Sequence, residues 1–135
     1  MPANECLPYK EDGSALTFKA TANVVGKRFV APSGNRTGGP GLSTDLANVY
    51  QAAHCPAGGH AIGVSKYDVP NGTLGGTHSR PGIIVPVTAG APVAAGQAVQ
   101  SDANGQAIPL AGGVKLGVCM NGAAAGADAE LRLTL

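Results

Sequence analysis

Tryptophan is absent from the sequence, and aromatic residues make up only 4% of its 135 positions. Charged residues are scarce as well, at 13%, and nine basic against eight acidic side chains leave a net charge of +1. Proteins that bind nucleic acid usually present a strongly basic surface, so this balance argues against a nucleic-acid partner. No apolar run approaches the roughly 20 residues that a helix needs to span a bilayer, so we also expect no membrane partner.

Glycine and proline are abundant instead, with 21 and 10 residues, and they make long helices improbable. Hydrophobic residues, at 44%, are too many for a disordered chain, and the length suits one domain. The first 14 residues show neither a secretory signal nor a transit peptide. We therefore expect a small folded protein that is made and kept in a cytosol.

Short strands separated by tight turns are the main prediction from the sequence pattern. Apolar residues alternate with polar ones from Leu16 to Ala20 and from Glu130 to Leu135, as in strands with one buried face. Four Asn/Gly pairs are typical of hairpin turns: Gly34-Asn35, Asn71-Gly72, Asn104-Gly105 and Asn121-Gly122. Further strands are expected at residues 28–31, 50–53, 60–67, 83–88, 97–101, 106–110 and 114–120. Nine short strands predict an all-β fold, either a small β-sandwich or a β-barrel-like domain.

The chain divides into an N-terminal arm, residues 1–15, and a β-rich domain, residues 16–135. Within the domain, Gly- and Pro-rich sequence predicts a long loop at about residues 33–59. A helix at residues 43–53 is an alternative there, because Leu46, Val49, Tyr50 and Ala53 follow a helical spacing.

A weak internal repeat relates the two halves. Residues 24–35 and 61–76 resemble residues 94–105 and 115–128, and both pairs run through an apolar-Gly-Val strand into a Gly-rich loop. A shared pattern of hairpins explains this likeness as well as a duplication does. The repeat is therefore taken only as support for an all-β fold.

No residue pattern indicates catalysis, a metal or a cofactor. Cys6, Cys55 and Cys119 are an odd number at wide spacing, which we interpret as buried small apolar residues. His54, Cys55 and His60 lack the short paired spacing of a structural zinc site. A nucleophilic site from Cys55, His78 and Asp68 can be imagined from residue types, but no local signature supports it. We expect a protein that is not an enzyme and that has no cofactor.

The whole pattern resembles the capsid cement or head decoration proteins of tailed bacteriophages, in the longer form found in phages of actinobacteria. The motifs that carry the resemblance are G-I-I-V-P-V-T-A-G, A-G-Q-A-V, K-L-G-V and A-A-A-G-A-D-A-E-L in residues 81–135, with T-A-N-V-V-G-K-R-F-V-A-P-S-G and H-A-I-G-V-S-K-Y-D-V before them. The resemblance implies a protein made in the host bacterium that binds the outer surface of the virion capsid and stabilises it. Its implied partners are the major capsid protein and its own copies, as a homotrimer at local three-fold positions.

Two groups of residues are candidates for contact with the capsid or a neighbouring copy. Leu7, Pro8 and Tyr9 lie in the arm, where tyrosine is a favoured interface residue, although a frayed tail explains the arm equally well. Lys27 and Arg28 are the only adjacent basic pair, and on a strand they would point to opposite faces, for which a solvated surface is the default explanation.

The alternative function is a receptor- or glycan-binding β-sandwich displayed on a surface. The scarcity of aromatic residues argues against it.

Overall fold

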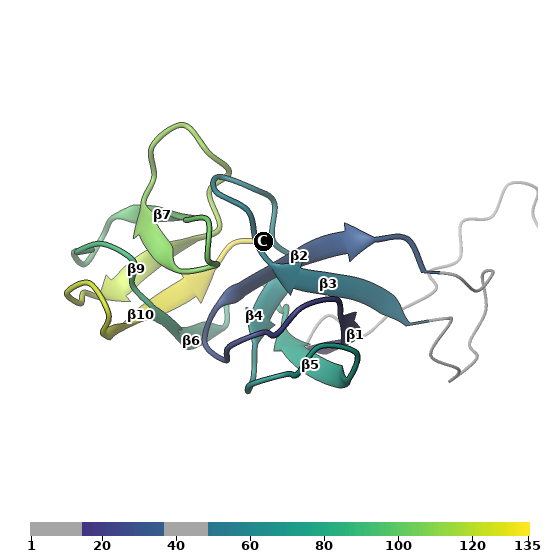
Figure 1. Cartoon of the computed structure of the whole chain (residues 1–135). Helices are drawn as coiled ribbons and strands as arrows, with labels where there is room; N and C mark the ends of the chain where they lie inside the picture. Colours follow the sequence, from purple (N-terminus) through teal and green to yellow (C-terminus); the bar gives the residue numbers. More distant parts are fainter. Residues whose placement is uncertain (1–14, 37–48) are drawn as a thin grey trace, which may run out of the picture.

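The computed structural model describes residues 15–36 and 49–135, and this part of the chain contains ten β-strands and no helix (Figure 1). Nothing in it could therefore cross a membrane as a helix. The strands are β1 (Ala15–Ala20), β2 (Phe29–Gly34), β3 (Tyr50–His54), β4 (Gly63–Ser65), β5 (Leu74–His78), β6 (Ile84–Thr88), β7 (Ala98–Ser101), β8 (Ala107–Pro109), β9 (Gly117–Asn121) and β10 (Asp128–Leu133). The all-β prediction is confirmed.

The ten strands form two units that follow each other along the chain. The first unit, β1 to β5, is a closed barrel in the order β1-β3-β2-β4-β5, and β1 also pairs with β5. The second unit, β6 to β10, is a five-stranded sheet in the order β6-β10-β9-β7-β8. Starting from the first strand of each unit, the two orders are the same strand by strand, because β1-β5-β4-β2-β3 corresponds to β6-β10-β9-β7-β8.

The hydrogen bonds repeat as well. An antiparallel bridge joins Val24 to Val69 in the first unit, with Val24 N donating to Val69 O at 2.9 Å. Its counterpart joins Val93 to Ala123, with an N···O distance of 3.0 Å. The parallel contact of Ala20 with Ala52 likewise recurs between Ala89 and Ala107. The internal repeat is thus a property of the fold, and it assigns the paired strand residues of one unit equivalents in the other.

The units differ at one seam. β1 and β3 pair over three residues and close the barrel, whereas β6 and β8 meet only at the Ala89–Ala107 bridge. The start of β2 occupies the gap that this leaves in the second unit. Phe29 N donates to Gly105 O at 2.7 Å, and Thr88 N donates to Lys27 O at 2.9 Å. The first unit thereby completes the second.

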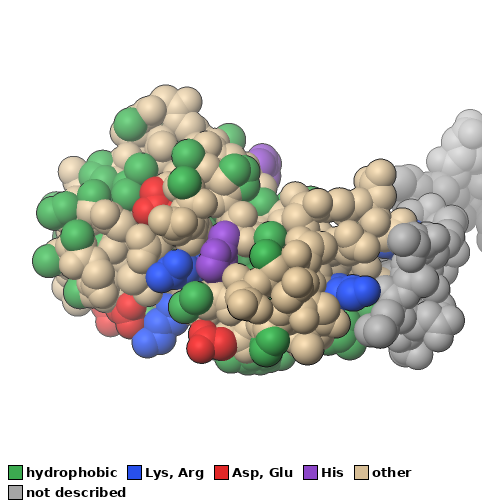
Figure 2. Space-filling model, in the orientation of Figure 1, with side chains coloured by type: hydrophobic (Ala, Val, Ile, Leu, Met, Phe, Trp, Pro, Cys, Tyr) green, Lys and Arg blue, Asp and Glu red, His purple; other side chains and the backbone are tan. Residues whose placement is uncertain are grey.

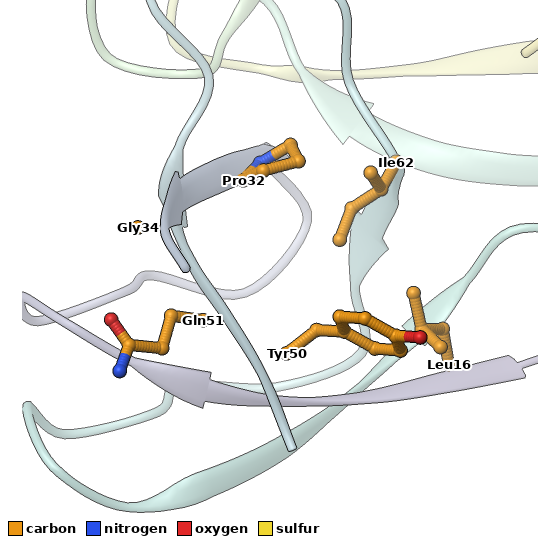
Figure 3. Close-up of a pocket in the computed structure, with 6 residues that line it drawn as sticks. All are labelled: Leu16, Pro32, Gly34, Tyr50, Gln51 and Ile62. Carbon is orange, nitrogen blue, oxygen red and sulfur yellow. The ribbon is translucent and has the colours of Figure 1, made fainter. Parts of the chain in front are cut away.

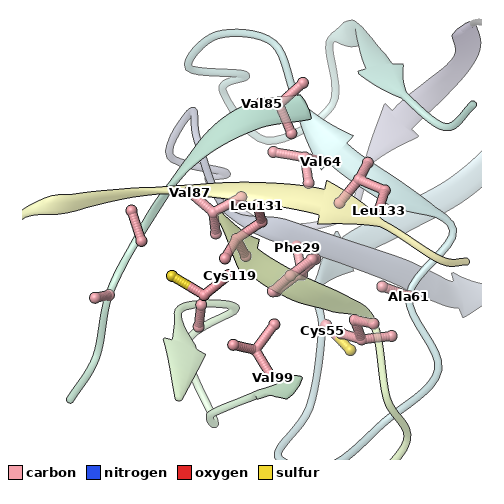
Figure 4. Packing of buried hydrophobic residues seen from close by; sticks show 14 of the residues in the cluster. Phe29, Cys55, Ala61, Val64, Val85, Val87, Val99, Cys119, Leu131 and Leu133 are labelled. Carbon is pink, nitrogen blue, oxygen red and sulfur yellow. The ribbon is translucent and has the colours of Figure 1, made fainter. Parts of the chain in front are cut away.

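Two hydrophobic clusters follow from this arrangement. The smaller one fills the barrel and contains Phe18, Ala20, Val24, Val30, Ala52 and Val69. The larger one combines the inner face of the second unit, including Val87, Cys119 and Leu131, with residues of the first unit such as Phe29 and Val64 (Figure 4). The two units therefore share one hydrophobic core.

Several sequence expectations need correction. Residues 33–59 are not one long loop, because β2 continues to Gly34 and β3 occupies Tyr50–His54. The helical alternative is wrong for residues 50–53, while residues 43–48 lie outside the described part. β2 begins at Phe29, so Lys27 and Arg28 precede the strand.

β5 was not expected at all, since its sequence, LGGTH, has no alternating pattern. The arm, apart from Ala15 in β1, lies outside the described residues.

Two turn predictions are confirmed by backbone geometry. Gly72 and Gly105 have φ angles of 83° and 75°, a region that glycine adopts without steric cost. The turn before β10 is instead made by Gly126, with φ 86°, and not by Gly122.

Side chains at equivalent interior positions of the two units differ in size. Phe18, Val69 and Gly75 of the first unit stand where the second unit has Val87, Ala123 and Ala129. A Cβ on Gly75 would clash with Cγ2 of Val69 and lie 3.2 Å from Cζ of Phe18. The larger neighbours therefore require a glycine on β5.

We predict that Gly75→Ala destabilises the protein by about 1–3 kcal/mol, as overpacking of a core does. Val69→Ala should relieve the clash, so the double variant should be more stable than the sum of the single effects predicts. Gly76→Ala is the matched control, because its Cβ would lie 3.5 Å from the nearest atom, Cδ of Lys66. Denaturant unfolding measures all four proteins. Equal losses for Gly75→Ala and Gly76→Ala would refute the packing argument.

Candidate functional site

Lys27 lies at the junction of the two units. Its Nζ donates to Oδ2 of Asp128 at 2.8 Å, and Oγ1 of Thr88 donates to the other oxygen of that carboxylate at 3.0 Å. The hydrogen bond from Lys27 is the main cause that holds the pKa of Asp128 below its ordinary value. Lys27 has a φ of 61°, and its equivalent in the second unit is Gly96, with φ 89°. The ion pair of Lys27 with Asp128 links the first unit to β10, and the Lys27 side chain is 54% exposed.

Arg28 is half-buried in the same junction. In the orientation that satisfies both neighbours, the Gln106 amide accepts from Nη2 of Arg28 at 3.3 Å and donates to Oδ2 of Asp102 at 3.2 Å. The buried Nε of Arg28 has no hydrogen-bond partner among the described residues. Of the candidate contact residues, then, Lys27 and Arg28 lie together at the junction, whereas Leu7, Pro8 and Tyr9 fall outside the described residues.

An open polar cleft borders the same junction. It has a volume of about 470 Å³, and Lys27, Lys66, Tyr67, Asp68 and Asp128 are among the residues that line it. Tyr67 is 53% exposed, and Oδ1 of Asp68 accepts a hydrogen bond from Gly26 N at 2.8 Å. The cleft carries two charges of each sign and one aromatic ring.

An apolar pocket lies at the end of the barrel where β2 ends and β3 begins (Figure 3). Its volume is about 190 Å³, and its walls are Leu16, Pro32, Gly34, Tyr50, Gln51 and Ile62. The Tyr50 ring points toward Leu16, and the Arg36 guanidinium carbon lies 5.0 Å from the centre of that ring. We call this the barrel-end pocket.

The outer face of the second unit carries a row of cross-strand neighbours. Arg132 on β10 stands opposite Val118 on β9, and Val118 stands opposite Ala98 on β7. Leu110 N donates to Ala98 O at 2.9 Å and so continues the row past β7. On the other side, Ile84 on β6 stands opposite Arg132. Hydrophobic side chains gather over this unit in Figure 2. We call Arg132, Val118, Ala98 and Leu110 the outer row.

No described group of three or more His, Cys, Asp and Glu side chains is placed to hold a metal ion. Nε2 of His54 accepts a hydrogen bond from Val25 N at 2.9 Å, while His60 is exposed and Cys55 is buried. These three residues are close in sequence, but the fold places them in different surroundings, and they do not form a shared metal site.

Cys55 and His78 do not form a nucleophilic pair. His78 lies at the end of β5 and Cys55 directly follows β3, so that β4 and β2 lie between them, and Cys55 is enclosed in the larger core. Burial raises the pKa of the Cys55 thiol and also that of Cys119. Thiols in such surroundings stay protonated and unreactive. The prediction that Cys55 and Cys119 are buried apolar residues is confirmed.

Two histidines make the stability of the protein depend on pH. Burial lowers the pKa of His54 below 6.5, with a smaller contribution from Arg28, and burial with Lys66 lowers that of His78. Both histidines take up a proton more readily in the unfolded chain, so the stability that they contribute is present above pH 6.5. It is lost as the pH falls from there through the lowered values.

We therefore predict that the free energy of unfolding decreases as the pH falls from about 6.5 through the lowered pKa values of His54 and His78. His54→Gln should remove part of this decrease, because its amide oxygen can still accept from Val25 N but does not titrate. Exchange of the exposed His60 for Gln is the control and should leave the profile unchanged. Urea unfolding at a series of pH values measures the effect. A His54→Gln profile identical to that of the unmodified protein would contradict the prediction.

Known proteins resemble this chain both in sequence family and in fold. The model of the phage cement protein family matches residues 9–135. No curated protein matches the chain significantly. Among solved structures, the N base of head fiber gp8.5 of bacteriophage phi29 has a similar fold, with a TM-score of 0.68 and 22% identity over 90% of this chain and 96% of that chain. The resemblance found in the sequence is confirmed, and the chain belongs to the phage cement protein family, whose members are capsid-associated structural proteins.

Proposed function

We propose that the protein binds the outer surface of an assembled phage capsid and stabilises the lattice of the major capsid protein. The observation that carries the proposal is the family match over residues 9–135, which includes all the described strands. The proposed partners are the major capsid protein and two further copies of this chain, arranged as a homotrimer at local three-fold positions. The proposed role requires no catalysis.

The fold supports this role on physical grounds. A shared core and the bonds at the junction hold the two units as one body, so a force on one unit reaches the other. A protein that binds only assembled shell subunits stabilises them by mass action. Several linked copies increase this effect, because each bound copy raises the effective concentration of the next.

The contact residues remain a proposal. Leu7, Pro8 and Tyr9 combine an aromatic and two apolar side chains in one short segment, which suits an anchor that orders on its partner. Lys27 offers a half-exposed ammonium next to the polar cleft, and Arg28 lies beside it. We propose these five residues as contacts with the shell or with a neighbouring copy.

The polar cleft favours a second candidate, a surface that binds a host receptor or glycan. An exposed tyrosine next to aspartate side chains can stack on a sugar ring and accept bonds from its hydroxyl groups. In that case the protein would bind a glycan through Tyr67, and Tyr67→Ala would abolish glycan binding without affecting capsid binding.

Sedimentation with undecorated shells tests the main proposal. We expect the protein to pellet with empty shells to a saturating level and to raise the temperature at which they break. Shells that are already saturated are the control and should bind no more protein. Failure to pellet with expanded and unexpanded shells alike would refute the proposed function.

Deletion of residues 2–12 tests the arm. If the arm anchors the protein, the shortened chain should bind shells at least about ten-fold more weakly, which corresponds to 1.4 kcal/mol. The matched control replaces Lys10 and Glu11 with alanine, which keeps the length of the arm together with Leu7, Pro8 and Tyr9. Equal shell occupancy for the deletion and the control would show that the arm is no anchor.

A further inference from the structure

The outer row of the second unit has an exact counterpart in the first unit. There, His78 stands opposite Val64, Val64 stands opposite Phe29, and Cys55 N donates to Phe29 O at 2.9 Å. In the second unit the same pairings join Arg132, Val118, Ala98 and Leu110. We call His78, Val64, Phe29 and Cys55 the covered row.

The two rows differ in what lies on them. Val64, Phe29 and Cys55 are at most 1% exposed, because the second unit packs on this face of the barrel. In the outer row, Leu110 is 41% exposed and Val118 and Ala98 are half-buried, while Ile84 beside them is 53% exposed. Nothing in residues 15–36 and 49–135 covers this face. Three of its four members are nevertheless apolar, as they are in the covered row.

The surface that receives the covered row also has an equivalent. Gly105 O accepts from Phe29 N, Oγ of Ser101 donates to Cys55 O at 3.2 Å, and Val85 and Leu116 belong to the same cluster as Val64. By the repeat, the residues at these positions in the first unit are Tyr50, Pro32, Leu16 and Ile62. All four line the barrel-end pocket.

We propose that the outer row of one molecule docks on the barrel-end pocket of a second copy. The second unit of one copy would then pack on the first unit of the next copy in the same way as the first unit packs on the second within one chain. Pairing of β1 with β3 closes the barrel where the second unit has its gap, so side chains rather than backbone enter the pocket. Leu110 is the exposed apolar side chain of the row, and the apolar pocket accepts it.

The symmetry of such a contact agrees with the proposed trimer, on whose self-association this inference rests. The two surfaces that meet are different, so the contact is head-to-tail and can close into a ring of three. A face-to-face contact of identical surfaces produces only dimers. A chain with a donor row on one unit and an acceptor pocket on the other, neither covered by any of the described residues, has the polarity that a ring requires.

Sedimentation velocity of the isolated full chain tests the donor row. We expect the unmodified protein to form a multimer and Leu110→Asp to weaken the association more than about ten-fold, because moving a carboxylate from water into an apolar pocket costs free energy. Leu74→Asp is the matched control. Leu74 is 43% exposed, and its equivalent in the second unit is Asp128, so the fold accepts an aspartate there. An unmodified chain that stays monomeric, or a Leu110→Asp chain that associates normally, would overturn the proposal.

Disulfide trapping tests the pairing of surfaces. In chains with Cys6 replaced by Ser, Leu110→Cys and Gln51→Cys variants should form a linked pair when they are mixed under oxidising conditions. Neither variant should link to itself, and the buried Cys55 and Cys119 should remain unreactive. A Leu110→Cys chain that links to itself would mean a face-to-face contact and would overturn the head-to-tail arrangement.

The segment before Ala15 is the competing occupant of the pocket. If deletion of residues 2–12 converts a monomer into a multimer, the pocket belongs to that segment and the proposal is wrong. None of these measurements involves shells, so their failure leaves capsid binding intact. Conversely, a protein that associates through the outer row but does not pellet with shells would refute only the proposed function.

Discussion

The fold depends on a close approach of backbone to backbone between its two units. A Cβ on Gly105 would lie 2.5 Å from Phe29 O, and one on Gly113 would lie 2.5 Å from Cα of Gly58. Only glycine allows these distances, and the one at Gly105 allows the start of β2 to enter the gap between β6 and β8. Phe29 then fills the core of a sheet to which it does not belong. Much of the high glycine content is therefore a requirement of packing as well as of turns.

The repeat explains how one strand order serves two different purposes. Inner positions are apolar in both units, since each unit must bury its interior. A larger side chain on one strand faces a smaller residue on its neighbour: Phe18 faces Gly75 in the first unit, and the smaller Val87 faces Ala129 in the second. The seam is where the units diverge. A paired β1 and β3 make a barrel that closes on itself, whereas the single β6–β8 bridge leaves a sheet that needs a neighbour. The same strand order thus yields one closed barrel and one open sheet, whose gap the first unit fills.

Sequence patterns predicted the fold class, most strands and the turns at Gly72 and Gly105, because alternation and Asn-Gly pairs are local signals. β5 was missed because LGGTH has no alternating pattern, and the packing of Gly75 against Phe18, a residue far away in the sequence, leaves no local signal. The motifs also predicted the family. The surfaces could not be predicted, since Val64 and Val118 occur in nearly the same local sequence, G-V-S and G-V-C, and only the packing of whole units separates a buried valine from a half-exposed one.

The proposed capsid role relies on contact area and needs no reactive group. Burial raises the pKa of the Cys55 and Cys119 thiols and lowers the pKa of His54 and His78, so in all four side chains burial favours the neutral form. Lys27 at the junction pairs with Asp128 within the chain, and its side chain stays 54% exposed. The two equivalent rows differ in exposure: the covered row of the first unit is packed against the second unit, whereas no described residue covers the outer row of the second unit. That asymmetry gives the molecule a direction, and a repeated unit with a direction is what a closed ring or a lattice clamp is built from.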